Sequence, residues 1–229
     1  MNSSLLKKIL ILATILSVPG FLYYLLQDQG KNRYRNLSYF GPKKLSGTFH
    51  SIRGKQIADT AFHKVEGVVL TDQNGQTFDI DKINDKVFIV NLFYTRSGFA
   101  TRTANTVVEK LSKSYQKNKR IQFISISLDP LHDTPSILNA YARTLGATQK
   151  WQFLTGSKES VYKTVNKALL LDAIDTDGKI AYNNMLVLLD HKHHIRGYYE
   201  AANHEAVAKL DDEIKVLMAE ELRNLKDGR

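Results

Sequence analysis

The chain has 229 residues, of which 43% are hydrophobic, so it is long and apolar enough to bury a domain core. Cysteine is absent, which excludes disulfides, thiolate metal sites, thiol peroxidase chemistry and lipid attachment through an N-terminal Cys. The net charge of +9 suggests nucleic-acid binding, but residues 1–57 hold nine Lys or Arg against one acid, Asp28, and the rest of the chain is nearly neutral. We therefore expect no nucleic-acid partner.

The N-terminal region contains an uncharged apolar run, ILILATILSVPGFLYYLL, at residues 9–26. Its length is at the short end of what crosses a bilayer, and we predict a transmembrane anchor there, after a short cytoplasmic segment at residues 1–8. A cleaved signal peptide is the alternative, although no A-x-A-like site follows the run. Residues 27–59 read as a basic juxtamembrane linker, a solvated tether near anionic lipid headgroups. Basic residues lie on both sides of the run, so the positive-inside rule alone does not orient it.

From residue 60 to residue 229 the sequence alternates between strand and helix signals, which indicates one α/β domain. The pair Asn74-Gly75 between two β-like runs predicts a hairpin, because both residues tolerate a positive φ. VFIVNLFY (87–94) and IQFISISL (121–128) are apolar and β-branched enough to be central strands. A helix between them, beginning near Thr101 to Thr103, is predicted by residues at helical spacing: Val107, Val108, Leu111 and Tyr115.

Capping signals predict the later helices. Thr134-Pro135 begins a helix that ends near Gly146, Ser157 caps another, and Asn203 opens the last one. The runs 185–190 and 195–201 form a second hairpin around a histidine-rich turn. This order predicts a thioredoxin-like fold, with a central mixed sheet, flanking helices and an extra N-terminal hairpin. In that fold the loop after the first central strand, here TRSGFAT, carries the chemistry.

Several local patterns resemble the Sco/SenC family, the membrane-anchored thioredoxin-like copper proteins associated with cytochrome oxidase assembly. SLDPLHDTP (127–135) is similar to the family's S-x-D-P-x-x-D-T-P signature, and WQFLTG (151–156) and LVLLD followed by IRGYY come in the expected order. The resemblance implies a single-pass inner-membrane protein with its domain in the periplasm. It also implies a membrane complex as the partner, such as cytochrome oxidase or its assembly machinery.

The resemblance further implies a copper site whose ligands this chain lacks. Family members bind copper through a Cys-x-x-x-Cys and a His, and these positions correspond here to Ser97, Thr101 and Tyr182. A neutral hydroxyl is a hard ligand that suits copper poorly, and it supplies no thiolate for redox exchange. We therefore expect no copper cofactor and no thiol enzyme activity. Ser97 reads as a loop hydroxyl and Thr101 as a helix cap.

Three other groups of residues are candidates for function. His191, His193 and His194 form the one clustered set of metal-capable side chains; we expect them to point into solvent, with a weak relocated metal site, joined by Met185, as the alternative. Arg96, Phe99 and Arg102, together with Phe93 and Tyr94, form either a partner contact surface or an ordinary mixture of core aromatics and solvated arginines. Asp129-Pro130 reads as a turn and Asp133-Thr134-Pro135 as a helix start, which is a structural role, and His132 in the same loop is expected to be exposed.

The sequence thus favours a ligand-less Sco-like protein that acts by contact, as an assembly factor or an accessory subunit of a membrane complex. A copper chaperone with a relocated site is the alternative. An enzyme that uses Ser97 as nucleophile ranks last, because no G-x-S-x-G elbow accompanies it.

Overall fold

The computed structural model of the protein describes residues 3–30, 36–52 and 55–226. The chain divides into two compact units, residues 1–36 and residues 37–229. The first unit contains the helix α1 (Ser3–Gly30), with Pro19 inside it. Within the described ranges, no helix has the combination of length and apolar character that crossing a membrane requires. The transmembrane anchor expected at residues 9–26 is therefore not supported.

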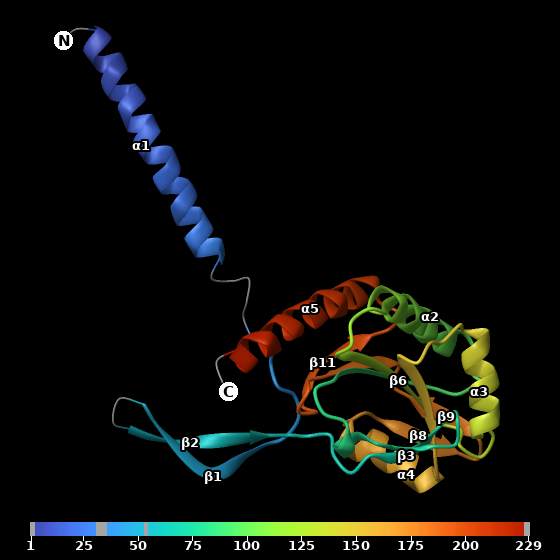
Figure 1. The fold of residues 1–229 in the computed structure, drawn as a ribbon. Coiled ribbons are helices and arrows are strands. Elements are labelled where there is room, and N and C mark those ends of the chain that lie inside the picture. The colour runs from blue at the N-terminus through green and yellow to red at the C-terminus, as the bar shows by residue number, and fades with distance from the viewer. Residues whose placement is uncertain (1–2, 31–35, 53–54, 227–229) are drawn as a thin grey trace. The chain divides into compact units, whose positions relative to one another are not determined.

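A seven-stranded sheet forms the centre of the second unit, in the order β11-β10-β5-β6-β7-β3-β4 (Figure 1). The middle strands β5 (Val87–Phe93), β6 (Ile121–Ser127) and β7 (Trp151–Thr155) run parallel. Antiparallel strands extend the sheet on both sides: β10 (Met185–Leu189) and β11 (Ile195–Glu200) on one, β3 (Val69–Asp72) and β4 (Thr77–Asp79) on the other. The mixed sheet of the predicted thioredoxin-like fold is confirmed.

Helices cover both faces of this sheet and create two cores. On one face lie α2 (Phe99–Ser114), α3 (Pro135–Thr144) and α5 (His204–Lys226). On the other lie α4 (Lys158–Lys163) and a π-helical turn, η2 (Thr164–Ala168). Alternation along β5 explains why the strand is apolar throughout: Ile89 faces the first core and Val90 the second.

The predicted helix caps are confirmed by their hydrogen bonds. Thr134 accepts from the amide of Ile137 at 3.5 Å, and Ser157 accepts from the amide of Ser160 at 3.1 Å. The side chain of Asn203 accepts from two amides in the first turn of α5. One expectation was wrong: α2 begins at Phe99, with Gly98 as its N-cap residue, so Thr101 lies inside the helix and does not cap it.

Two hairpins were missed by the sequence analysis. The strands β1 (Lys43–Ile52) and β2 (Lys55–Phe62) pair within a stretch that the sequence had largely assigned to a basic linker. The second hairpin joins β8 (Ala173–Thr176) to β9 (Lys179–Tyr182). Its turn is Asp177-Gly178, with φ values of 52° and 82°, a recognised hairpin signal. A short 3-10 helix, η1 (Ile80–Lys82), follows β4.

Candidate functional site

The loop between β5 and α2 leaves the sheet at its centre, because β5 has a paired strand on each side. Residues 94–98 form this loop, and its turn is closed by the amide of Ser97, which donates to the carbonyl of Tyr94 at 3.0 Å. Ser97 is half-buried, whereas Thr101, one turn into α2, is almost fully buried. The parallel pairing of β5 with β6 sets the direction of the loop, so its side chains emerge at the carboxyl end of the central strands.

The structure brings together the three positions that the sequence assigned to a degenerate copper site. Tyr182 reaches them from β9, and its hydroxyl lies 2.9 Å from the hydroxyl of Thr101, a residue 81 positions earlier in the chain. The side chain of Ser97 also acts on this phenol and lowers its pKa. The ring of Tyr94 packs edge-on against Tyr182 with 6.2 Å between centroids. The result is a small hydroxyl cluster at the mouth of the loop.

The electrostatics of this cluster keep the phenol neutral. Burial raises the pKa of Tyr182 above its ordinary value of 10.0, and the hydrogen bonds from Thr101 and Ser97 only partly oppose this. At neutral pH the cluster therefore offers three uncharged hydroxyl oxygens. Copper ions favour thiolate sulfur and imidazole nitrogen, so this donor set does not fit copper.

A buried carboxylate anchors the loop from the opposite side. Asp133 is fully buried and accepts hydrogen bonds from the amide of Thr95 at 3.0 Å, from the Thr95 hydroxyl, and from the Ser127 hydroxyl at 2.5 Å. Nδ1 of His132 lies 2.9 Å from Oδ1 of the same carboxylate. Asp133 of the SLDPLHDTP pattern thus ties the loop after β6 to the loop after β5, a structural role beyond the helix start that the sequence predicted.

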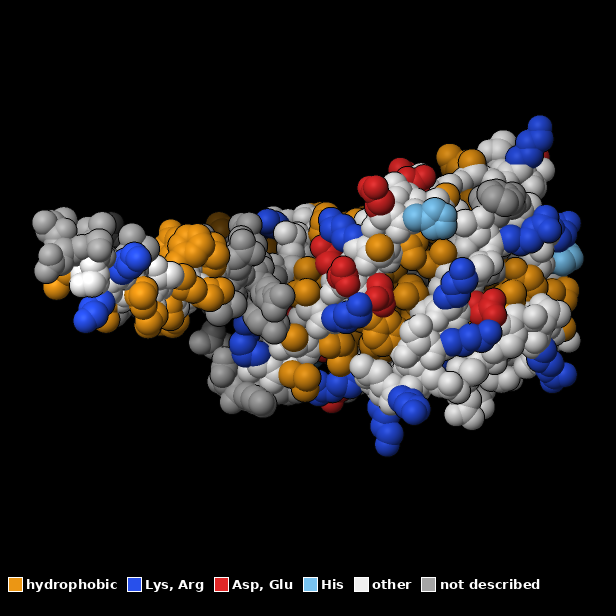
Figure 2. All heavy atoms as spheres, turned by 90° about the horizontal axis from the view of Figure 1, so that it is seen from above, with side chains coloured by type: hydrophobic (Ala, Val, Ile, Leu, Met, Phe, Trp, Pro, Cys, Tyr) orange, Lys and Arg blue, Asp and Glu red, His pale blue; other side chains and the backbone are white. Residues whose placement is uncertain are grey.

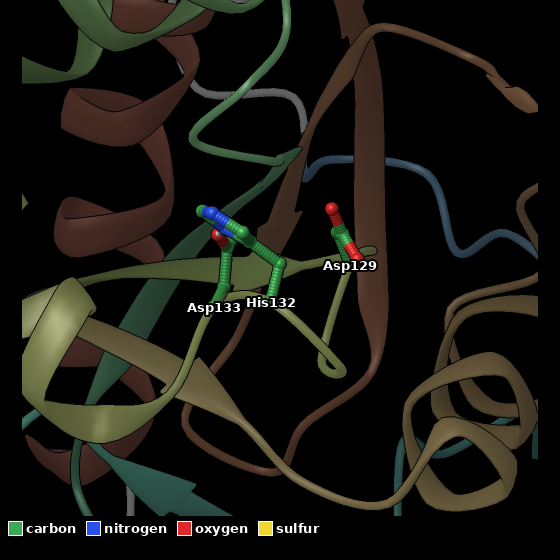
Figure 3. A group of neighbouring side chains, drawn as sticks. All are labelled: Asp129, His132 and Asp133. Atoms are coloured by element: carbon green, nitrogen blue, oxygen red, sulfur yellow. Dashed lines mark hydrogen bonds and ion pairs between the residues drawn. The ribbon is translucent and has the colours of Figure 1, made fainter. Parts of the chain in front are cut away.

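Asp129, His132 and Asp133 lie close enough to invite a metal-site interpretation, since their ligand atoms are within 4.8 Å of one another (Figure 3). In Figure 3 the ring of His132 lies beside the Asp133 carboxylate, with Asp129 set apart from them. The guanidinium of Arg96 binds Asp129 at 2.6 Å, and this hydrogen bond raises the pKa of Arg96. Protein donors engage both oxygens of Asp133 and Oδ2 of Asp129, so the cluster holds the loop in place.

The residues considered as a contact surface have different surroundings. Arg96 remains 60% exposed although it pairs with Asp129, and Arg102 is exposed on α2. Phe93 is a core residue. The side chain of Phe99 lies outside the described residues. The arginines thus stand at the surface around the hydroxyl cluster, while Phe93 belongs to the core.

The histidine-rich turn differs from the prediction that its side chains point into solvent. His193 is buried at a positive φ of 66°, with Nε2 at 3.0 Å from the carbonyl of Ile83. His191 contacts Glu221 at 2.9 Å, and His194 contacts Asp190 at 3.2 Å. Each imidazole has a different partner, so within the described ranges the three do not form a metal-binding group.

Met185, the remaining candidate ligand, heads β10 and lines a separate hollow of about 490 Å³ that Tyr182 also lines. The turn histidines are not among the residues that line this hollow. A relocated site built from all four residues is therefore not supported by their placement.

Sequence reasoning missed a buried ion network beside the turn. Arg196, only 3% exposed, contacts Asp190 at 3.2 Å and Glu220 of α5 at 2.9 Å. It also donates to the carbonyl of Leu37 at 2.7 Å and lies 4.1 Å from the ring centroid of Tyr39. The sequence signal for this network was the arginine inside the otherwise apolar strand IRGYY. Arginine is almost never buried without a partner, so its position in such a strand indicates a buried ion pair. The network fastens the start of the second unit to its last helix.

Comparisons with known proteins agree with this architecture. The chain is 26% identical over 109 residues to the SCO1 protein homolog of Bacillus subtilis (strain 168). This match covers 47% of the chain and 56% of the relative, so the chain spans about half the length of that relative. It is 27% identical over 169 residues to the SCO2-like protein RP587 of Rickettsia prowazekii (strain Madrid E), covering 73% of each.

Among solved structures, a SCO1/SenC family lipoprotein from Bacillus anthracis str. Ames superposes with a TM-score of 0.63 at 22% identity, covering 68% of this chain and 95% of that one. At this identity the likeness establishes the fold alone. The sequence pattern of the SCO1/SenC family matches residues 59–218, which is more than half of the chain. The chain therefore belongs to the SCO1/SenC family.

Proposed function

We propose that this protein is a ligand-less Sco protein that acts through protein contacts, as an assembly factor or accessory subunit of a membrane complex. Its family is linked to copper binding and to cytochrome oxidase assembly. The observation that carries the proposal is the cluster of Ser97, Thr101 and Tyr182, three neutral hydroxyls at the positions where the resemblance implies copper ligands. The family scaffold persists around this cluster, so a role that needs the surface of the fold but not its metal is favoured.

Copper titration tests the first half of the proposal. The full chain in detergent is titrated with Cu(I) against a competing chelator, and we expect no stoichiometric copper. The matched control is the triple variant Ser97→Cys, Thr101→Cys, Tyr182→His, which restores two thiols and an imidazole on the same scaffold and should gain a copper site. A firmly held copper ion in the wild-type chain would overturn the proposal.

Recovery of a partner complex tests the second half. We expect cytochrome oxidase subunits to co-purify with the tagged chain from its native membranes. Arg102→Glu, which reverses a charge beside the hydroxyl cluster, should reduce this recovery. Lys110→Glu is the control, because Lys110 is equally exposed on α2 but lies two turns further on. Equal recovery with both variants would show that the surface around the cluster is not the contact.

The proposal includes attachment to the inner membrane through residues 9–26, with the domain in the periplasm. Its support is the uncharged apolar composition of this run and the exposed apolar side chains on α1, such as Ile15 and Phe21, together with the lipoprotein relative. Retention of the chain in the membrane pellet after alkaline carbonate washing is expected. Protease digestion of the domain in spheroplasts, but not in intact cells, would support the periplasmic side. Release of the chain by carbonate would refute attachment through this run.

Two alternatives have distinct signatures. If copper is held by relocated ligands, wild-type protein will bind it and replacement of His191, His193 and His194 by Ala will release it. If the protein is an enzyme, Ser97→Ala will change a measured turnover. Neither alternative is favoured by the contacts described above, because the histidines bind separate carboxylate or carbonyl partners and Ser97 faces a phenol.

A further inference from the structure

A hollow lined by lysines lies on the opposite face of the domain from α2 and α5. It has a volume of about 600 Å³ and is bounded by the base of the β1–β2 hairpin, the segment leading into β3, and the α4–η2 turn. Four exposed lysines line it, with one glutamate, Glu66, as the only acid: Lys44, Lys64, Lys163 and Lys167. We call this hollow the lysine groove.

The lysines of this groove lack carboxylate partners among the described residues, unlike many other basic residues of the domain. On the face seen in Figure 2, acidic and basic side chains are interspersed. Elsewhere in the domain, Lys215 pairs with Asp211 at 2.6 Å and Lys113 pairs with Glu109 at 2.6 Å. In the part of the chain that the structure describes, none of the four groove lysines forms an ion pair. The groove therefore concentrates uncompensated positive charge.

This concentration brings no benefit to folding. Lys163 and Lys167 are four positions apart across the junction of α4 and η2, and both line the groove. Like charges at this spacing on a helix destabilise it by about 0.2–0.5 kcal/mol. A ligand of opposite charge would relieve this repulsion. The π-helical turn that carries Lys167 belongs to a rare class that occurs often at functional sites.

The walls of the groove are fastened to each other. His63 of the segment after β2 lies with Nε2 at 2.7 Å from the carbonyl of Ala168 at the end of η2. Gly41 passes over this ring at a φ of 96°, where an added Cβ would lie 2.7 Å from the Cβ of His63. The hairpin base and the helical turn are thus held at a fixed separation, and a ligand would not have to order them.

We propose that the lysine groove binds phosphate groups that together carry at least two negative charges. Lysine ammonium groups bind phosphate as point charges, and four of them around a hollow of this volume exceed what a single phosphate would contact. Two neighbouring anionic phospholipid headgroups and one soluble diphosphate both supply such phosphate groups. The site does not involve Ser97, Thr101 or Tyr182, so it stands apart from the proposed contact function.

Amine-reactive labelling of the full chain in nanodiscs, read by mass spectrometry, tests the proposal in two arms. In phosphatidylcholine nanodiscs, inorganic pyrophosphate is added as the soluble probe. In the second arm phosphatidylglycerol replaces part of the phosphatidylcholine and no pyrophosphate is present. We expect slower labelling of Lys163 and Lys167 in at least one arm, while Lys110 and Lys117 of the opposite face are labelled at an unchanged rate.

The outcome identifies the source of the phosphate. Protection by pyrophosphate alone assigns a soluble ligand, protection by phosphatidylglycerol alone assigns a headgroup, and protection in both supports the shared chemistry. Replacing Lys163 and Lys167 by Gln should weaken binding roughly thirtyfold, at about one kcal/mol for each lysine. In this variant, binding is followed by the protection of the two remaining groove lysines, Lys44 and Lys64. The matched control replaces Lys110 and Lys117 by Gln and should leave it unchanged. No protection in either arm, or equal weakening in the control pair, would overturn the proposal.

Discussion

Asp133 offers the sharpest test of how the loop after β5 is held. Replacing it by Ala removes a fully buried carboxylate that accepts two hydrogen bonds from Thr95 and one from Ser127, and that also contacts Nδ1 of His132. The fold around the loop otherwise keeps its packing, because the change deletes a small polar group and no apolar side chain. The variant therefore isolates the contribution of the clamp between the two loops.

The magnitude follows from the burial of the donors. A hydrogen bond to a charged group contributes about 1.5–3 kcal/mol, and a buried donor left without a partner costs about 1–3 kcal/mol. Ser127 is fully buried and cannot regain a water partner, so its bond counts in full. Thr95 is half-buried and its two donors regain water in part. We expect a loss of about 3–5 kcal/mol in the free energy of unfolding.

Urea unfolding of the full chain in detergent measures this loss. Fluorescence of Trp151 is a suitable probe, because it is the single tryptophan of the chain and is fully buried in β7. Asp133→Asn is the matched control, since it keeps the volume and one acceptor oxygen and should lose clearly less than Asp133→Ala. A loss below about 1 kcal/mol for Asp133→Ala would contradict the reasoning, because the net value of even one neutral hydrogen bond is that large.

Three further predictions concern the C-terminal part of the domain. Burial lowers the pKa of His193 below its ordinary 6.5. The unfolded chain therefore binds a proton at this residue more readily than the folded chain, and the free energy of unfolding decreases as the pH falls below about 6.5. Between about pH 7.5 and pH 5.5, the melting temperature should fall more steeply in wild-type protein than in His193→Asn. Asn is a suitable replacement because it tolerates the positive φ of this position. Parallel plots of melting temperature against pH for the two proteins would refute this. Arg196→Met removes the buried cation that Asp190 and Glu220 share and should cost about 3–5 kcal/mol in urea unfolding. A variant as stable as wild type would show that the ion network contributes nothing net. Gly197→Ala places a Cβ in steric conflict with the hydroxyl and ring of Tyr199 and should cost about 1–3 kcal/mol. Gly98→Ala should change stability little, because an added Cβ there meets no heavy atom within 4 Å, and equal costs for the two variants would count against the steric argument.

The sequence by itself determined the elements whose signals are local. A helix cap such as Thr134 bonds an amide three residues away, so its pattern is visible in any short window of sequence. The same is true of the uninterrupted apolar run of β5, which is buried on both faces. The Asp177-Gly178 turn was also readable from the sequence but was overlooked. These local signals, taken in order, were enough for the mixed sheet and its helices.

Only the tertiary structure decided which side chains meet. Tyr182 contacts Thr101 across 81 positions, Arg196 selects Glu220 from α5, and His193 turns inward while its neighbours bind separate carboxylates. The physical reason is that the partner of a buried polar group is chosen by packing between distant elements, where an unpaired donor or charge is costly, and no local window of sequence contains both members of the pair.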